Sequence, residues 1–148
     1  MSLLDFLFKK KQTSLYKEDH SSKTSGELIT EITGGADLVD GKQTWELAES
    51  KKHDIEVMKR CCDAELKKMN IADWVPAPYY FERVAILSRK QKNYKQEIFY
   101  CEQYIKTIAE FYSKSGREHY ADVRKGPRYQ AIVKRLPKAM ELDAKHST

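Results

Sequence analysis

The chain contains no apolar run that approaches the roughly 20 residues needed to span a lipid bilayer. Cysteine is also scarce, with three residues in all, and Cys61 and Cys62 are adjacent on one predicted helix. An odd number of cysteines with two neighbours among them does not make a disulfide framework. We therefore expect a reducing compartment, and hence a cytoplasmic location.

Catalytic and metal-binding patterns are missing as well. The chain has four histidines, none with a cysteine or carboxylate at metal-ligand spacing: His20, His53, His119 and His146. Gly34-Gly35 lacks the preceding strand and the lysine of a phosphate-binding loop. The sequence thus predicts no enzyme activity, no catalytic residue, no cofactor and no metal ligand.

The first eight residues are strongly apolar. Asp5 interrupts this run and three lysines follow it, whereas a secretory signal carries its positive charge first. The apolar residues are Leu3, Leu4, Phe6, Leu7 and Phe8. They either dock on the protein's own core or on a second copy, or they meet anionic lipid together with the lysines. We expect the first alternative, so a membrane partner is not predicted.

Composition describes one globular domain. Hydrophobic residues make up 41% of the 148 residues and charged residues 33%, which suffices for a single core. Residues 9–26 are polar without apolar periodicity, so we expect a flexible linker there. The predicted organisation is an N-terminal apolar and basic segment with its linker at 1–26, followed by a single helical domain at 27–145.

Two patterns precede residue 71. Threonine and isoleucine in Glu27–Thr33, followed by two glycines and Leu38-Val39, favour a short β-hairpin near the N-terminus. Gly41–Asn70 predicts one long amphipathic helix. The apolar face of that helix comprises Trp45, Ala48, Ile55, Met58, Cys62, Leu66 and Met69. Pro76 and Pro78 then favour an extended link.

Residues 77–112 carry the strongest signal, which predicts two amphipathic helices joined by a polar turn. The stripe of the first helix is Phe81, Val84, Ala85 and Ser88. The stripe of the second recurs at steps of three and four: Tyr94, Ile98, Cys101, Ile105, Ile108 and Tyr112. We expect Asn93 to take a left-handed backbone in the turn or to bond its own chain. Tyr94, Ile98 and Ile105 should be buried, and Tyr80, Phe81 and Tyr104 should be core aromatics.

From Pro78 to roughly Phe111 this hairpin resembles a tetratricopeptide repeat, a 34-residue helix-turn-helix unit. Four residues match the family's large and small positions: Phe81, Val84, Ala85 and Tyr94. Four others depart from it, in place of a tyrosine, the turn glycine, a small residue and an alanine: Ser88, Lys92, Glu97 and Tyr104. A single repeat does not bury its own faces, so the long helix should pack on one side and the last helix on the other.

The resemblance implies a protein-binding groove along the first helix. It would present Tyr79, Glu82, Ile86, Arg89 and Lys90 to another protein. We expect Tyr79 to be partly exposed beside Arg89. The partner's identity and the oligomeric state stay open.

The C-terminal third is basic. It should form a final helix from Gly126-Pro127, with a kink or restart at Pro137. The apolar stripe of this helix is Tyr129, Ile132, Val133 and Leu136. From Ser113 onward nine Lys and Arg stand against four Asp and Glu, which accounts for the whole net charge of +5. Nucleic acid is therefore the alternative partner, through Arg124, Lys125, Arg128, Lys134, Arg135 and Lys138.

These observations predict a mainly α fold, a compact helical bundle that contains the repeat-like hairpin. The function they favour is a non-catalytic protein–protein interaction module, an adaptor that uses the hairpin groove. Association with nucleic acid through the basic C-terminal third is the alternative.

Overall fold

The computed structural model describes residues 15–19, 21–114, 116–117 and 120–147. Within these ranges the protein is mainly helical, which confirms the predicted fold class. The helices are α2 (Ser25–Thr33), α3 (Thr44–Leu47), α4 (Ile55–Ala72), α5 (Pro78–Lys90), α6 (Tyr94–Ser113), the 3-10 helix η2 (Val123–Lys125) and α7 (Pro127–His146). No helix in the described part combines the length and the apolar character of a membrane span.

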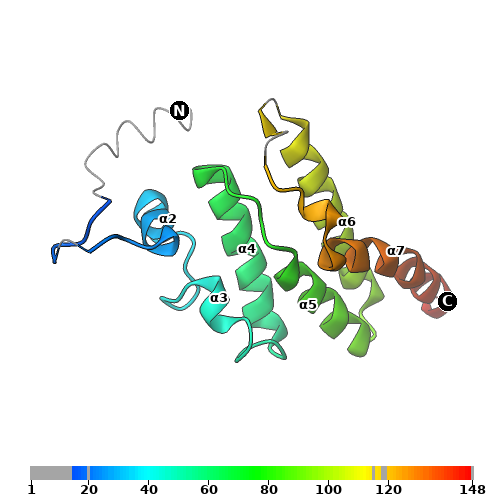
Figure 1. The fold of residues 1–148 in the computed structure, drawn as a ribbon. Coiled ribbons are helices and arrows are strands. Elements are labelled where there is room, and N and C mark those ends of the chain that lie inside the picture. The colour runs from blue at the N-terminus through cyan, green and yellow to red at the C-terminus, as the bar shows by residue number, and fades with distance from the viewer. Residues whose placement is uncertain (1–14, 20, 115, 118–119, 148) are drawn as a thin grey trace.

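The helices pack mainly against their neighbours in the chain. Helices α2, α4, α5 and α6 follow one another across the molecule, and α7 extends beside α6 to the C-terminal end (Figure 1). The main contacts join α4 to α5, α5 to α6, and α6 to α7, and α7 also reaches α5. The hairpin α5–α6 is therefore covered by α4 on one side and by α7 on the other, as predicted.

The hairpin core is aromatic, and its predicted members are confirmed. Tyr80, Phe81 and Tyr104 are all buried, and the rings of Phe81 and Tyr104 lie 4.8 Å apart. The hydroxyl of Tyr104 donates a 2.7 Å hydrogen bond to the carbonyl oxygen of Pro76. This bond fixes the extended link between α4 and α5 onto the middle of α6, so the link is part of the core.

The buried face of α6 includes Cys101 and Ile108 of the predicted stripe, but its other members lie one residue before the predicted ones. Its buried residues are Glu97, Cys101, Tyr104, Ile108 and Phe111. Tyr94, Ile98 and Ile105 are only partly buried, so the prediction that they are buried is wrong. Because α6 contacts α5 and α7 at once, the apolar stripe alone does not locate the centre of its buried arc. The Tyr94 ring lies 5.2 Å from the ring of His146, towards the end of α7.

The predicted β-hairpin is wrong for residues 25–33, which form helix α2. Thr24 and Glu27 make a complete capping box: the Thr24 side chain accepts the Glu27 N–H, and the Glu27 carboxylate accepts the Thr24 N–H at 2.7 Å. Gly34 ends the helix in the left-handed conformation with φ of 65°. These caps, with packing on α4, outweigh the strand preference of threonine and isoleucine. The helix also begins inside the segment predicted as a linker.

The long helix predicted over Gly41–Asn70 is divided. Helix α3 ends at Leu47, and α4 begins at Ile55 after Asp54, whose side chain accepts the Val57 N–H at 3.1 Å. Cys62 and Met58 are buried on α4 as predicted, but Trp45 on α3 is 68% exposed rather than part of the core. The N-cap at Asp54 starts a new helix axis, so residues before it no longer share a face with those after it.

The turn between α5 and α6 contains Lys92 in the left-handed region, with φ of 58°. The resemblance to a tetratricopeptide repeat would align this position with the turn glycine of that family. Asn93 is instead the N-cap of α6, and its side chain accepts the Gln96 N–H at 3.1 Å. The second alternative predicted for Asn93, a bond to its own chain, is therefore confirmed.

Helix α7 continues through Pro137 as a single element, so of the two predicted alternatives, a kink or a restart, the restart does not occur. Proline removes the donor that would reach the carbonyl of Val133, one turn earlier. Both residues are exposed, so water can take the place of that donor. The exposure of Val133 also corrects its place in the predicted apolar stripe, whereas Ile132 is fully buried.

Candidate functional site

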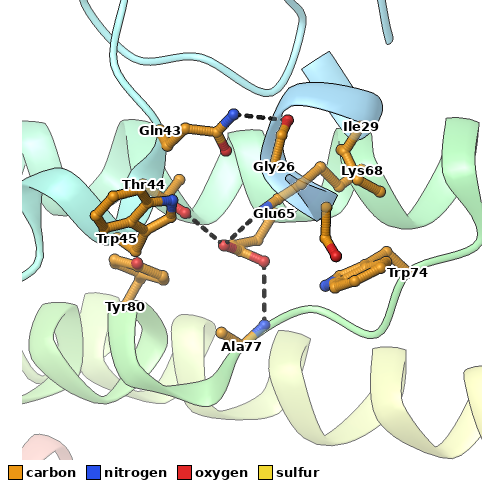
Figure 2. A pocket seen from close by; sticks show the side chains of 11 residues that line it. Gly26, Ile29, Gln43, Thr44, Trp45, Glu65, Lys68, Trp74, Ala77 and Tyr80 are labelled. Carbon is orange, nitrogen blue, oxygen red and sulfur yellow. Dashed lines mark hydrogen bonds and ion pairs between the residues drawn. The ribbon is translucent and has the colours of Figure 1, made fainter. Parts of the chain in front are cut away.

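A pocket of about 320 Å³ opens between α2, the start of α3, α4 and the link to α5. We call it the two-tryptophan pocket, because Trp45 and Trp74, the only tryptophans of the chain, both line it (Figure 2). Trp45 is 68% exposed and Trp74 is 44% exposed. The lining residues are Ser25, Gly26, Ile29, Gln43, Thr44, Trp45, Glu65, Lys68, Trp74, Ala77 and Tyr80.

Glu65 lies at the centre of this pocket, and it is only 2% exposed (Figure 2). One of its oxygens accepts the Thr44 hydroxyl at 2.8 Å and lies 3.0 Å from the Lys68 ammonium. The other accepts the backbone N–H of Ala77 at 3.2 Å. The carboxylate thus ties α4 to α3 and to the link before α5. With three donors it is satisfied inside the protein.

Gln43 closes the pocket against α2. Its side-chain amide donates to the Gly26 carbonyl at 2.8 Å and to the Thr30 hydroxyl at 2.5 Å. A Cβ added at Gly26 would lie 3.3 Å from the Gln43 amide, tighter than almost all real contacts of this kind. Glycine at position 26 therefore lets α2 approach α3, and this approach shapes the pocket wall.

The remaining walls are apolar. Ile29 on α2 and Tyr80 on α5 are both buried, and burial raises the pKa of Tyr80 to about 12, so its hydroxyl stays neutral at ordinary pH. A second hollow of about 530 Å³ adjoins the pocket and shares Ser25, Gly26, Gln43 and Trp45 with it. Glu27 and Glu46 line this outer hollow. The site therefore offers apolar walls with an acidic rim beside them.

The protein-binding residues predicted on α5 do not form one open groove. Tyr79 is partly exposed as predicted, but its hydroxyl donates to the Ala48 carbonyl at 2.7 Å, and the Arg128 guanidinium lies 4.7 Å from its ring centre. Glu82 is 3.7 Å from the same guanidinium. Ile86 is partly buried and Lys90 is exposed. The surface of α5 is thus partly occupied by α7 and by the segment after α3.

Arg89 points elsewhere, to Glu97, which has no exposed surface. Arg89 and Arg135 both pair with the Glu97 carboxylate, at 2.9 Å and 3.0 Å. Arg89 also donates to the Arg135 carbonyl at 3.3 Å. The predicted proximity of Tyr79 and Arg89 is replaced by this triad, which joins α5, α6 and α7.

The basic cluster predicted for nucleic acid is largely paired within the protein. Arg135 holds Glu97, Arg128 lies near Glu82, Arg124 pairs with Asp122 at 2.8 Å, and Lys138 pairs with Glu141 at 3.3 Å. The other two members of the cluster, Lys125 and Lys134, are exposed, and neither takes part in an ion pair among the described residues. The structure therefore does not gather these six side chains into one free cationic surface.

The three cysteines are buried as free thiols. Burial raises the pKa of Cys61 to about 11 and that of Cys101 to about 12, and it raises the pKa of Cys62 well above its ordinary value. The thiolate is the nucleophile and metal ligand, so these side chains are inert while the protein is folded. Within the described ranges, no three histidine, cysteine or carboxylate side chains are grouped to hold a metal ion.

Sequence reasoning missed the two-tryptophan pocket. It assigned Trp45 to the core face of a long helix and left Trp74 in a connecting segment. Two signals were available: the capping box of Thr24 and Glu27, which defines α2, and Asp54, which separates α3 from α4. No protein-family model, no curated protein and no solved structure matches this chain significantly.

Proposed function

We propose that this protein is a non-catalytic interaction module that captures an apolar segment of another protein at the two-tryptophan pocket. The observation that carries the proposal is the exposure of both tryptophans beside one pocket, at whose centre the Glu65 carboxylate is already hydrogen-bonded within the protein. Tryptophan is enriched among the residues that dominate binding energy in protein interfaces. A pocket with apolar walls and few polar groups is the usual form of a specific binding site.

The electrostatics of the site favour a protein ligand over a nucleic acid. Glu27 and Glu46 lie beside the pocket, and the Thr24 N–H that Glu27 accepts holds the pKa of that carboxyl below its usual range. Glu27 already pairs with Lys17, and the ion pairs of the described residues do not include Glu46, so this second carboxylate disfavours phosphates and suits a peptide that carries lysine or arginine next to apolar residues. The C-terminal basic cluster is the weaker alternative, because four of its six members already have acidic partners.

The saturated carboxylate of Glu65 supports a binding role rather than a chemical one. A general base needs a free lone pair directed at its substrate. Here Thr44, Lys68 and Ala77 already donate to the carboxylate, so its role is to hold the shape of the pocket. In this proposal the repeat-like hairpin α5–α6 is the support of the site: Tyr80 forms part of the wall, and the link that ends at Ala77 forms its edge.

A display library of short linear peptides tests the proposal. Peptides selected on the wild-type protein should contain large apolar residues, and the variant Trp45→Ala/Trp74→Ala should lose at least tenfold in affinity, equal to about 1.4 kcal/mol. The thermal midpoint of that variant should change little, because both side chains are exposed.

The matched control is Phe99→Ala, which removes an aromatic side chain that is 57% exposed on α6, outside the pocket. It should leave peptide affinity unchanged. Selected peptides that bind the double tryptophan variant as tightly as the wild type would place the binding surface elsewhere.

A further inference from the structure

The two-tryptophan pocket matches the chemistry of a segment of its own chain. We propose that the apolar side chains of the segment 3–8 dock between Trp45 and Trp74, with Lys9–Lys11 beside the acidic rim, so that a partner must displace this intramolecular ligand. Residues 1–14 lie outside the described residues. The inference rests on the proposed function in one respect, that the pocket accepts an apolar segment.

The described chain begins next to the pocket. The Leu15 carbonyl accepts the Lys23 N–H at 2.9 Å, and Lys23 precedes the pocket residue Ser25 by two positions. Leu15 therefore lies on the order of 10 Å from the pocket rim. Phe8 is seven residues before Leu15, a stretch that can span up to about 25 Å. The apolar segment has ample length to reach the pocket from this side.

In the N-terminal segment the lysines follow the apolar residues, just as the acidic rim lies next to the apolar pocket. The pocket's apolar walls, Ile29, Trp45, Trp74 and Tyr80, suit the run of leucine and phenylalanine. The outer hollow with Glu27 and Glu46 adjoins Trp45, and the three lysines directly follow the apolar run. Lys17 of the same N-terminal stretch already pairs with Glu27 at 3.0 Å. Lys17 thus occupies Glu27, and Glu46 is the rim carboxylate that the three lysines would face.

Docking within the chain would regulate the pocket without a second site. A segment tethered by a short linker acts at a local concentration in the millimolar range. A partner then binds only to the fraction of molecules with an open pocket, so its apparent affinity falls in proportion to that fraction. The expected consequence is that the intact chain binds a pocket peptide several-fold more weakly than a chain whose apolar segment is disabled.

Intrinsic fluorescence tests this docking, because the only tryptophans of the chain line the pocket. In the full-length chain, Phe6→Asp/Phe8→Asp should shift the emission to longer wavelength and increase quenching by acrylamide, while the far-UV circular dichroism stays unchanged. A synthetic peptide of residues 1–14, added to this variant, should reverse both changes in a saturable manner. The same peptide with Phe6→Asp/Phe8→Asp should not.

The matched control in the full-length chain is Leu15→Asp, which changes an apolar side chain that is 63% exposed outside the proposed ligand. It should leave the emission as in the wild type. The proposal is overturned if Phe6→Asp/Phe8→Asp leaves emission and quenching unchanged. It is equally overturned if the wild-type emission depends on protein concentration in parallel with dimer formation, since a second copy then occupies the pocket.

Two further outcomes separate this inference from the proposed function. If library peptides need both tryptophans but the peptide of residues 1–14 does not bind, the interaction module stands and the internal ligand fails. If the 1–14 peptide binds but no library peptide needs the tryptophans, the internal ligand stands and partner capture fails. Lipid binding would give another result. If the wild type partitions into vesicles of anionic phospholipid, and Phe6→Asp/Phe8→Asp does not change the tryptophan emission measured without vesicles, the apolar segment binds lipid and the docking is overturned.

Discussion

Two glutamates are buried among the described residues, and the regions around them differ. Glu97 has no exposed surface and is held by Arg89 and Arg135, which come from the helices on either side of α6. Glu65 is nearly as buried, but it faces a pocket and is held by a hydroxyl, an ammonium and one backbone N–H. Glu97 is therefore part of the closed interior, whereas Glu65 supports the shape of an open pocket.

The difference shows how the same residue type serves two purposes. Burying a charge costs several kcal/mol, and the cost is offset only when partners satisfy it. Around Glu97 the partners are themselves charged and partly buried, so removal of any member leaves charges unpaired. Around Glu65 only one partner is charged, the buried Lys68, so removal of this carboxylate leaves one cation rather than two without its partner. The first region should therefore be intolerant of change and the second only moderately sensitive.

The largest effect should follow from Glu97→Ala. Two guanidinium groups would lose their common partner in the interior, and the free energy of unfolding should fall by about 3–5 kcal/mol, measured by urea denaturation. Glu102→Ala, at an exposed position of the same helix, is the control and should change stability by less than about 0.5 kcal/mol.

A triple variant separates charge from shape in this region. Glu97→Leu combined with Arg89→Met and Arg135→Met replaces the triad by apolar side chains and should restore most of the lost stability. If Glu97→Ala costs no more than Glu102→Ala, the triad is not a structural element and the contrast between the two regions fails.

A smaller loss should follow from Glu65→Ala. Thr44, Lys68 and Ala77 would all lose their acceptor, so the free energy of unfolding should fall by about 1–3 kcal/mol. Because all three partners line the pocket, tryptophan emission should change at temperatures where the protein is still folded. The control Glu56→Ala removes an exposed carboxylate of α4 and should have almost no effect. A loss as large as that of Glu97→Ala would show that the pocket floor is as closed as the triad.

The smallest effect concerns alkaline pH. Cys61 lies one turn before Glu65 and Cys101 one turn after Glu97; burial, followed by the neighbouring glutamate, raises the pKa of these thiols to about 11 and about 12. An unfolded thiol ionises near pH 9, so the unfolded chain loses protons first. Stability is then fully present below pH 9 and falls as the pH rises towards each folded value.

Between pH 9 and pH 10 each thiol should account for about 1 kcal/mol of the decline in unfolding free energy. The variants Cys61→Ala and Cys101→Ala should each show a decline smaller by this amount, measured by urea titrations at both pH values. Tyrosines contribute equally to wild type and variants. Declines that are identical in all three proteins would mean that the thiols are not shielded in the way the structure shows.

The local elements of this fold were largely predictable. The periodicity of residues 77–112 predicted the α5–α6 hairpin, and Gly126-Pro127 predicted the start of α7. The division of the long helix and the identity of α2 were also encoded locally, in Asp54 and in the Thr24–Glu27 capping box, but β-branched composition and a continuous apolar stripe obscured these signals. Capping chemistry outweighs composition when the two conflict.

The site was less predictable than the fold. Arg89 was assigned to a binding groove and Arg135 to a basic patch, yet both converge on Glu97. Nothing in the local sequence shows that Arg135 bonds Glu97, 38 positions away, or that Arg89 bonds the backbone carbonyl of Arg135, 46 positions away. Exposure of the tryptophans likewise depends on where the surrounding helices end.

The sequence by itself determined the helical class, the helix caps and the hairpin, because hydrophobic period and capping bonds act within a few residues. Only the tertiary structure decided which face of each helix is buried, which cations are paired, and that Trp45 and Trp74 line one pocket. Those properties depend on the sum of packing against several helices, and α6, which contacts α5 and α7 at once, shows why an apolar stripe on one element does not locate its buried side.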